Sequence, residues 1–128
     1  LVAFGERSLH VFNVHLGLNQ WQRARQVELV ANLIENNCDA KDPVLLAGDF
    51  NDWHRKLDRS IVEGYGFRNA FEGMSGDAIN TWHSRRPVFA LDRIYVRNLV
   101  PKTAERLAGQ PFSELSDHLP LWAELVQG

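Results

Sequence analysis

Residues 44-VLLAGDFN-51 decide the fold, because four consecutive apolar residues run directly into a glycine and a polar turn. An apolar run of this length, bounded by a turn, is typical of a β-strand that is covered on both faces. Asp49 and Asn51 follow the run, so they lie at the end of that strand. Open α/β sheets bind their ligands at strand ends, and we therefore expect a buried strand over 44–47 with a functional loop after it.

The segment before this strand predicts a β-hairpin followed by a helix. Residues 1–4 and 9–16 have the β-branched and aromatic character of strands, and residues 5–8 form the turn between them. Asn19 has the position of a helix N-cap, with Gln22 three residues later as its capping-box partner. One face of this helix is apolar and consists of Ala24, Val27, Ala31 and Ile34. Strand, helix and buried strand together predict a βαβ-like unit.

Shorter elements follow the central strand. The pattern predicts a helix over 55–62 and strands over 80–84, 91–96, 102–107 and 121–126. We therefore expect an α/β fold in which one mixed β-sheet carries its helices on one face. All 128 residues fit a single domain.

Composition excludes several classes of protein. With 45% hydrophobic and 23% charged residues, the chain has the composition of a globular protein. The net charge of −2 gives no general attraction to nucleic acid, so such a substrate would need local basic residues. Cys38 is the only cysteine, which excludes an internal disulfide. No apolar run reaches the roughly 18 residues of a membrane span, and we expect a cytoplasmic protein.

Asp49 and Asn51 are the strongest candidates for a chemical role. Residues i and i+2 of an extended chain point the same way, so both side chains face one site while Phe50 turns into the core. A carboxylate beside an amide can orient a water and hold a phosphoryl oxygen. The alternative is an Asp/Asn turn, in which the two side chains only cap their own backbone.

Asp117 and His118 form the second candidate, within 116-SDHLP-120. Asp117 offers oxygen ligands to a hard cation. His118 can donate a hydrogen bond to a phosphate or act as an acid or base near neutral pH. The alternative is a turn that leaves the histidine exposed to solvent.

Asp92 and His15 complete the set of candidates. Asp92 begins an otherwise apolar strand, where a carboxylate is costly unless it is paired. A histidine is a natural partner because the carboxylate fixes its tautomer, and Arg93 is an equally ordinary one. His15 ends a strand between apolar neighbours, a pattern more often found for a structural histidine than for a catalytic one.

Four segments in this order resemble the C-terminal half of the endonuclease/exonuclease/phosphatase superfamily, also called deoxyribonuclease I-like. They are 13-NVHL-16, 48-GDFN-51, 91-LDRI-94 and 116-SDHLP-120. The segment 15-HLGL-18 and Trp53 resemble those of uncharacterised bacterial members most. The resemblance covers nearly the whole chain. It implies that residues 1–128 are half of a four-layer α/β/β/α sandwich, and that the N-terminal half of the domain is absent.

The resemblance also implies a role for each matching residue. Asp49 would orient or deprotonate the attacking water, and Asn51 would position it and contact the substrate. His118 would bind a non-bridging phosphate oxygen, and Asp92 would orient His118. His15 would protonate the leaving group.

Two further positions follow from the same resemblance. Thr81 lies where the family often has a threonine near the phosphate, and Asp117 would bind the metal ion together with Asp49. The expected metal is Mg²⁺ or Mn²⁺, because such a cation neutralises developing charge and activates water.

The expected function is divalent-metal-dependent hydrolysis of a phosphoester, with nucleic acid or a phospholipid head group as the leading substrate. Two metal ligands of the family, an Asn and a Glu, belong to the absent half, so we expect the 128-residue chain to be inactive alone. The sheet face meant for that half would be exposed and would favour self-association. The alternatives are a catalytically silent binding or regulatory module on the same fold, and a phosphomonoesterase.

Overall fold

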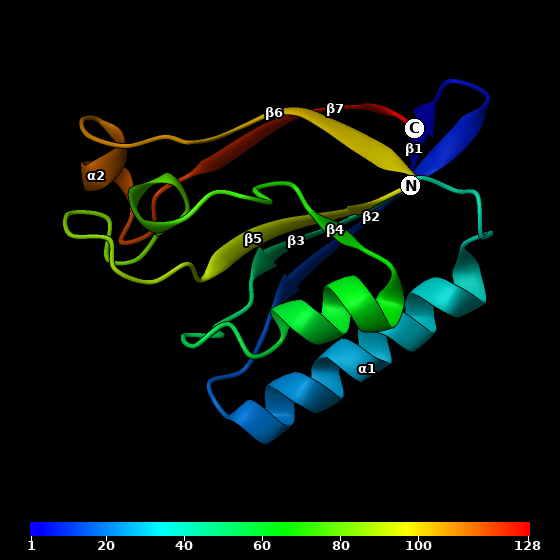
Figure 1. Cartoon of the computed structure of the whole chain (residues 1–128), viewed down its shortest axis with the longest axis horizontal. Helices are drawn as coiled ribbons and strands as arrows, with labels where there is room; N and C mark the ends of the chain where they lie inside the picture. Colours follow the sequence, from blue (N-terminus) through cyan, green and yellow to red (C-terminus); the bar gives the residue numbers. More distant parts are fainter.

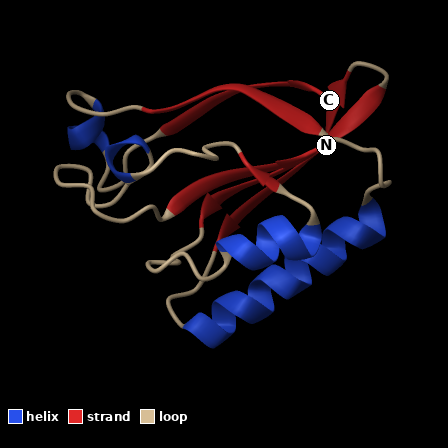
Figure 2. Ribbon diagram, in the orientation of Figure 1, coloured by secondary structure: helices blue, strands red, loops and turns tan.

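A computed structural model describes all 128 residues and contains one five-stranded mixed sheet (Figures 1 and 2). The strand order is β1-β2-β3-β5-β4. The strands are β1 (Val2–Phe4), β2 (Arg7–His15), β3 (Val44–Asp49), β4 (Arg68–Asn69) and β5 (Asp92–Arg97). The predicted α/β class, with a mixed sheet that carries its main helices on one face, is confirmed.

The N-terminal half of the chain forms the predicted βαβ unit. β1 and β2 pair as an antiparallel hairpin, and β2 pairs parallel with β3. The helix α1 (Gln20–Asn37) connects these two parallel strands across one face of the sheet (Figure 1). β3 then pairs antiparallel with β5, which makes β3 the central strand.

The helix α1 begins at the predicted N-cap. The Asn19 side chain accepts hydrogen bonds from the backbone N–H groups of Trp21 and Gln22, at 2.8 and 3.3 Å. The Gln22 side chain returns no hydrogen bond to Asn19, so only half of the expected capping box forms. The buried face contains Val27, Ala31 and Ile34 as predicted, but Ala24 is exposed.

Arg23 takes the buried place that the pattern assigned to Ala24. Its guanidinium donates to the backbone carbonyls of Gly17 and Leu18, at 3.3 and 2.6 Å. The apolar stem of an arginine packs like a hydrophobic side chain while its head is hydrogen-bonded. Arg23 therefore fastens the start of α1 to the loop that follows β2.

The main hydrophobic core lies between the five-stranded sheet and the helices that cover one of its faces. It contains Leu16, Val27, Ile34, Val44, Leu46, Phe50, Leu57, Ile61, Phe67 and Tyr95. The second helix was expected over 55–62. It begins a few residues later than expected and contains the π-helix η1 (Ser60–Gly64). Val44 and Leu46 are buried, whereas Leu45 and Ala47 are only partly buried. The central strand is thus fully covered on its helix side only.

A separate two-stranded sheet lies over the other face of the five-stranded sheet (Figure 1). It contains β6 (Leu99–Arg106) and β7 (Leu121–Gln127), so the expectation of a single sheet was wrong. The short helices η2 (Gly76–Ala78) and α2 (Phe112–Leu115) belong to the connections. A small apolar cluster joins the two sheets and contains Ala70, Phe71, Ile79, Ala90, Ile94, Ala104 and Leu121.

Three further details correct or limit the sequence-based picture. The strand expected over 80–84 does not form, because only Trp82 makes isolated β-bridges there, to Phe89 and His118.

Several apolar side chains on the strands remain open to solvent, including Val11 of β2 and Trp122 of β7, which are 43% and 49% exposed. None of the helices has the length and apolarity needed to span a membrane.

Candidate active site

The register of the sheet brings three of the candidate residues into one row. His15 ends β2 and is the Cα partner of Asp49, which ends β3. Asp49 is in turn the partner of Asp92, the first residue of β5. Partners across a sheet direct their side chains to the same face. Residues that are far apart in the sequence therefore meet at one edge because hydrogen bonding fixes the strand register.

Gly48 allows this register. Its φ of +137° is a conformation that residues with a Cβ rarely adopt. A Cβ at Gly48 would also overlap the backbone carbonyl oxygen of Val14 on the neighbouring strand. The glycine of the 48-GDFN-51 segment therefore lets β3 approach β2 closely, one residue before Asp49.

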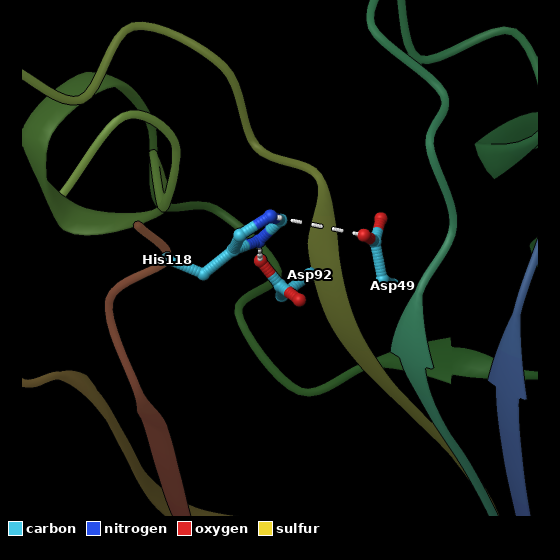
Figure 3. Close-up of side chains that lie close together, drawn as sticks. All are labelled: Asp49, Asp92 and His118. Carbon is cyan, nitrogen blue, oxygen red and sulfur yellow. Dashed lines mark hydrogen bonds and ion pairs between the residues drawn. The ribbon is translucent and has the colours of Figure 1, made fainter. Parts of the chain in front are cut away.

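The loop after β3 combines the two roles that the sequence left open for Asp49 and Asn51. Asp49 Oδ1 accepts a hydrogen bond from the Asn51 backbone N–H at 2.9 Å, so the Asp/Asn turn does form. The Asn51 amide donates to the Leu16 carbonyl at 2.6 Å and ties this loop to the end of β2. Phe50 is buried in the core as predicted. Asp49 Oδ2 remains free of this turn and faces His118 (Figure 3).

His118 lies between two carboxylates that come from different strands (Figure 3). Its Nδ1 is 2.6 Å from Asp92 Oδ2, and its Nε2 is 3.8 Å from Asp49 Oδ2. Asp92 therefore pairs with the histidine and not with Arg93. The carboxylate fixes the tautomer that carries its proton on Nδ1 and leaves Nε2 directed at the site.

Thr81 holds Asp92 in place through two hydrogen bonds. Its hydroxyl donates to Asp92 Oδ2 at 2.6 Å and accepts from the Asp92 backbone N–H at 3.2 Å. Thr81 has no exposed surface. Since a substrate cannot reach a fully buried side chain, Thr81 lies where it can position Asp92 but not where it can contact the phosphate.

The charges around His118 favour its protonated form. Partial burial lowers its pKa, but the hydrogen bond that it donates to Asp92 raises it, as do the charges of Asp92, Asp49 and Asp117. The net result is a pKa above the usual value of a histidine. His118 is therefore a better hydrogen-bond donor to an anion near neutral pH than an isolated histidine would be.

The remaining candidates line the same open cleft. The lining residues are His15, Leu16, Gly17, Leu18, Asp49, Asn51, Asp92, Asp117 and His118. His15 is 78% exposed, and its Nε2 is 3.6 Å from Asp49 Oδ2. It is thus not a buried structural histidine. Asp117 is exposed, and its backbone carbonyl accepts a hydrogen bond from the Ser84 N–H at 2.7 Å.

The donor atoms at this edge suit a hard divalent cation. One ligand atom each of Asp49, Asp92 and His118 lie within 4.8 Å of one another. Mg²⁺ in proteins typically uses one or two carboxylates and completes its shell with water and substrate oxygens. Asp92 Oδ2 is already engaged by Thr81 and His118, and Asp117 lines the same cleft without belonging to this cluster.

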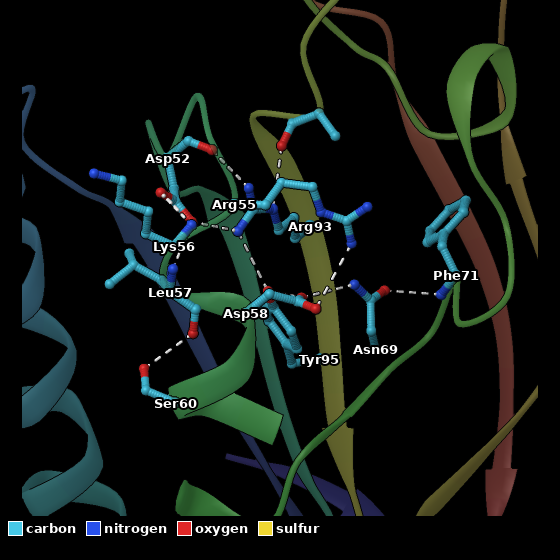
Figure 4. A network of polar contacts seen from close by, with 11 residues as sticks. Asp52, Arg55, Lys56, Leu57, Asp58, Ser60, Asn69, Phe71, Arg93 and Tyr95 are labelled. Atoms are coloured by element: carbon cyan, nitrogen blue, oxygen red, sulfur yellow. Dashed lines mark hydrogen bonds and ion pairs between the residues drawn. The ribbon is translucent and has the colours of Figure 1, made fainter. Parts of the chain in front are cut away.

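A buried network that the sequence did not reveal holds the site loop in place (Figure 4). The Arg93 guanidinium binds Asp52 Oδ2 at 3.0 Å and the Asp52 carbonyl at 2.8 Å, and both residues are almost fully buried. The Asp52 carboxylate also accepts the backbone N–H groups of Lys56 and Leu57. Arg93 follows Asp92 and Asp52 follows Asn51. The pair therefore fixes the distance between the two strand ends that carry the candidate residues.

The same network continues into the core through Tyr95. Its hydroxyl donates to Asp58 Oδ1 at 2.6 Å, and burial raises the pKa of Tyr95 so that it stays neutral. An arginine in an apolar strand was the one sequence signal for this network. Its acidic partner lies 41 residues away, beyond what a local pattern shows.

The sequence model of the endonuclease/exonuclease/phosphatase family matches residues 2–118. The chain belongs to this family. Its members are metal-dependent phosphoester hydrolases. The resemblance carried by the four short segments is thereby confirmed, and the cleft beside Asp49 and His118 lies at the edge that those segments share.

Several known proteins are similar to the chain over nearly all of its length. The uncharacterized protein YbhP of Escherichia coli K12 is 36% identical over 119 residues, which cover 93% of this chain and 47% of YbhP. D. rerio TDP2, solved with a single-strand DNA product, superposes with a TM-score of 0.73 at 22% identity, over 96% of this chain and 58% of TDP2.

A third similar structure is that of a protein named as a phosphatase. The mannosyl-6-phosphatase Bt3783 of Bacteroides thetaiotaomicron superposes with a TM-score of 0.69 at 21% identity, over 95% of this chain and 52% of that protein. At these identities the two solved structures show the fold alone. The chain spans about half the length of the curated relatives that it matches.

Proposed function

We propose that this protein is a Mg²⁺- or Mn²⁺-dependent hydrolase of phosphodiesters. The observation that carries the proposal is the position of His118, which Asp92 holds at 2.6 Å while its free Nε2 faces Asp49. A donor and an acceptor that face the same cleft can hold a phosphate oxygen and orient the attacking water beside it. The membership of the endonuclease/exonuclease/phosphatase family supports the same reaction class.

Each residue at the strand ends has a role in this proposal. Asp49 accepts a proton from the attacking water or orients it, because its Oδ2 is free of the turn made by Oδ1. Protonated His118 donates to a non-bridging phosphate oxygen and stabilises the charge that develops there. Asp92 keeps the imidazole in place, and Thr81 keeps Asp92 in place.

The other two polar side chains contact the substrate. Asn51 is held by the Leu16 carbonyl through its amide nitrogen, so its carbonyl oxygen is left to position the water or the substrate. His15 is exposed at the mouth of the cleft, where it can protonate the leaving oxygen. These two roles depend on where the phosphate binds.

Asp49 and Asp117 are the residues that would hold the metal ion. The ion would neutralise negative charge on the phosphate and lower the pKa of a bound water. Two carboxylates alone form an incomplete coordination site for such an ion. Since the chain spans about half the length of its relatives, we propose that further ligands come from an N-terminal half and that residues 1–128 alone are inactive.

One alternative function and one narrower choice of substrate each have a specific observation in their favour. The fold is shared with a mannosyl-6-phosphatase, which favours a phosphomonoesterase. It is also shared with TDP2 bound to a single-strand DNA product, which favours a phosphodiester of nucleic acid. The completeness of the Asp49–His118–Asp92 cluster argues against a catalytically silent module, which has no need to keep three such groups together.

A substrate panel tests the proposal on the full-length protein. We expect Mg²⁺ or Mn²⁺ to support hydrolysis of bis-p-nitrophenyl phosphate, a diester, at a higher kcat/KM than hydrolysis of p-nitrophenyl phosphate, a monoester. His118→Ala is expected to lower kcat by about a hundredfold or more, and His54→Ala, outside the cluster, is the matched control. A preference for the monoester would favour the phosphatase, and no metal-dependent hydrolysis of either ester would overturn the proposal.

A further inference from the structure

Residues 82–89 form a tight hairpin between Thr81 and Asp92. Trp82 and Phe89 pair through two backbone hydrogen bonds of 3.1 Å, and the Val88 N–H donates to the Trp82 carbonyl at 2.8 Å. At the tip, the Arg86 N–H donates to the His83 carbonyl at 2.9 Å. The backbone of this hairpin is therefore well satisfied, and its tip is presented in a defined conformation.

The hairpin is also fastened to the segment that carries His118. The buried Ser84 donates through its N–H to the Asp117 carbonyl at 2.7 Å and through its hydroxyl to the Ser113 carbonyl at 3.0 Å. Trp82 makes a β-bridge to His118 itself. The hairpin and the candidate active site consequently form one hydrogen-bonded unit.

Two exposed arginines, Arg85 and Arg86, lie at the tip of this hairpin. Their side chains make no hydrogen bond and no ion pair, whereas every other arginine of the chain makes at least one. In a protein of net charge −2, two adjacent uncompensated guanidinium groups form a local basic patch. Arginine is well suited to phosphate because its planar fork donates two parallel hydrogen bonds.

Three aromatic rings lie at the base of the hairpin. Trp53 packs against Trp82 and Phe89, with ring centroids 5.0 and 4.6 Å apart, and all three side chains are only partly buried. Trp53 belongs to the loop after β3, so the cluster borders that loop as well. Partly exposed aromatic rings beside arginines are the combination with which proteins bind single-stranded nucleic acid, because bases stack on the rings and phosphates meet the cations.

The distances suit a substrate that extends beyond one phosphate. Ser84 is hydrogen-bonded to Asp117, so the Cα of Arg85 lies within about 10 Å of the Cα of Asp117. In one strand of duplex DNA the phosphates recur every roughly 3.4 Å of helix axis, and an unstacked single strand spaces them further apart. A strand with one phosphate at His118 would therefore bring a neighbouring phosphate within reach of an arginine side chain on the hairpin.

We propose that the hairpin 82–89 binds single-stranded nucleic acid, with Arg85 and Arg86 on phosphates next to the one that is hydrolysed and with the Trp53, Trp82 and Phe89 rings beside the bases. This inference rests on the proposed function only for the choice of the hydrolysed phosphate. An anionic lipid surface fits less well, because Val88 is the only strongly exposed apolar side chain at the tip and a single one is ordinary on any surface.

Salt-dependent binding tests the proposal without catalysis. The full-length protein, with metal chelated, is titrated into a fluorescein-labelled single-stranded oligonucleotide at several salt concentrations, and anisotropy is recorded. Each phosphate contact on a single strand contributes roughly 0.7 to the slope of log K against log salt. We expect Arg85→Ala/Arg86→Ala to reduce the magnitude of this slope by about 1.4 and to weaken binding at low salt at least tenfold. Arg85→Lys/Arg86→Lys should keep the slope.

The matched control is Arg25→Ala/Arg59→Ala, which removes the same charge from two exposed arginines elsewhere. Thermal unfolding of each variant checks that the fold is kept. Equal slopes for the hairpin variant and the control, or no binding by the wild type, would overturn the proposal. So would binding to phosphatidylserine vesicles that is lost in the hairpin variant while oligonucleotide binding is kept.

Hydrolysis separates this inference from the proposed function. Bis-p-nitrophenyl phosphate has no neighbouring phosphate, so the hairpin variant should hydrolyse it at the wild-type rate while its kcat/KM on the oligonucleotide falls. Loss of activity on both substrates to the same extent would contradict the inference. If the wild type hydrolysed neither bis-p-nitrophenyl phosphate nor the oligonucleotide, the proposed function would be wrong. The binding experiment would still decide whether the hairpin binds nucleic acid.

Discussion

At the scale of single residues, Asp92 determines the protonation of His118. The hydrogen bond from Nδ1 to Asp92 and the surrounding carboxylates raise the histidine pKa above its usual value despite partial burial. Asp92→Asn keeps the shape but removes a charge, so the pKa of His118 should fall towards or below that usual value. NMR titration of the histidine ring in the metal-free protein measures this. An unchanged midpoint would mean that Asp92 does not act on His118.

Arg93 and Asp52 are the second pair at this scale. Arg93→Met leaves a buried carboxylate without its partner, and such losses cost about 3–5 kcal/mol. We therefore expect the free energy of unfolding in urea to fall by that amount. Arg59→Met is the control, because its ion pair with Glu63 is exposed and such pairs contribute at most about 1 kcal/mol. Equal losses for the two variants would contradict the structural role of Arg93.

The residues of the site could be predicted from short motifs, whereas their supports could not. Asp49, Asp92 and His118 belong to segments whose local pattern suggested chemistry, and the structure places them together. The exposure of His15 and the burial of Thr81 were not predictable, because both depend on which strands become neighbours. The Asp52–Arg93 pair depends on a contact between residues 41 positions apart.

At the scale of elements, Asp42 organises the connection between α1 and β3. Its carboxylate accepts the Asp39 backbone N–H at 2.9 Å and lies 3.1 Å from His10 Nε2 on β2. The hydrogen bond from Asp39 is the main cause of a lowered pKa for Asp42, and His10 and Arg7 add to it. This connection is thus held more firmly when Asp42 is ionised.

The sign of the pH effect follows from that lowered pKa. The stabilisation by Asp42 is complete above its unfolded pKa of about 3.8 and is lost as the pH falls through the lower folded pKa. The difference in free energy of unfolding between wild type and Asp42→Asn should therefore be constant above about pH 4 and shrink below it. Urea unfolding over this range measures it, and a difference that grows on acidification would contradict the assignment.

Elements with a strong local pattern were predicted well. The β-hairpin, α1 and the central strand follow from periodicity and from the Asn19 cap. The segment 80–84 looked like a strand because of its composition, but its polar groups serve Asp92 and the hairpin instead. The split between the five-stranded sheet and the β6–β7 sheet depends on pairing between distant strands, which no local pattern specifies.

At the scale of the whole molecule, the second face of the five-stranded sheet is only partly covered. Leu45 and Ala47 of β3 are partly buried there, and Val11 of β2 is 43% exposed. We predict that the 128-residue chain self-associates, because open apolar surface favours association. Light scattering over a range of concentrations measures this. A monomeric 128-residue chain would contradict the prediction.

The central claim is that side chains from separate strands act together on one phosphate. A double-mutant cycle of Asp92→Asn and His118→Ala in the full-length protein tests it most directly, with kcat on bis-p-nitrophenyl phosphate as the measurement. Groups that act as a unit are strongly non-additive. We predict that each single variant is severely impaired and that the double variant is about as slow as the slower single one. Losses that multiply, or single variants with wild-type rates, would contradict the account.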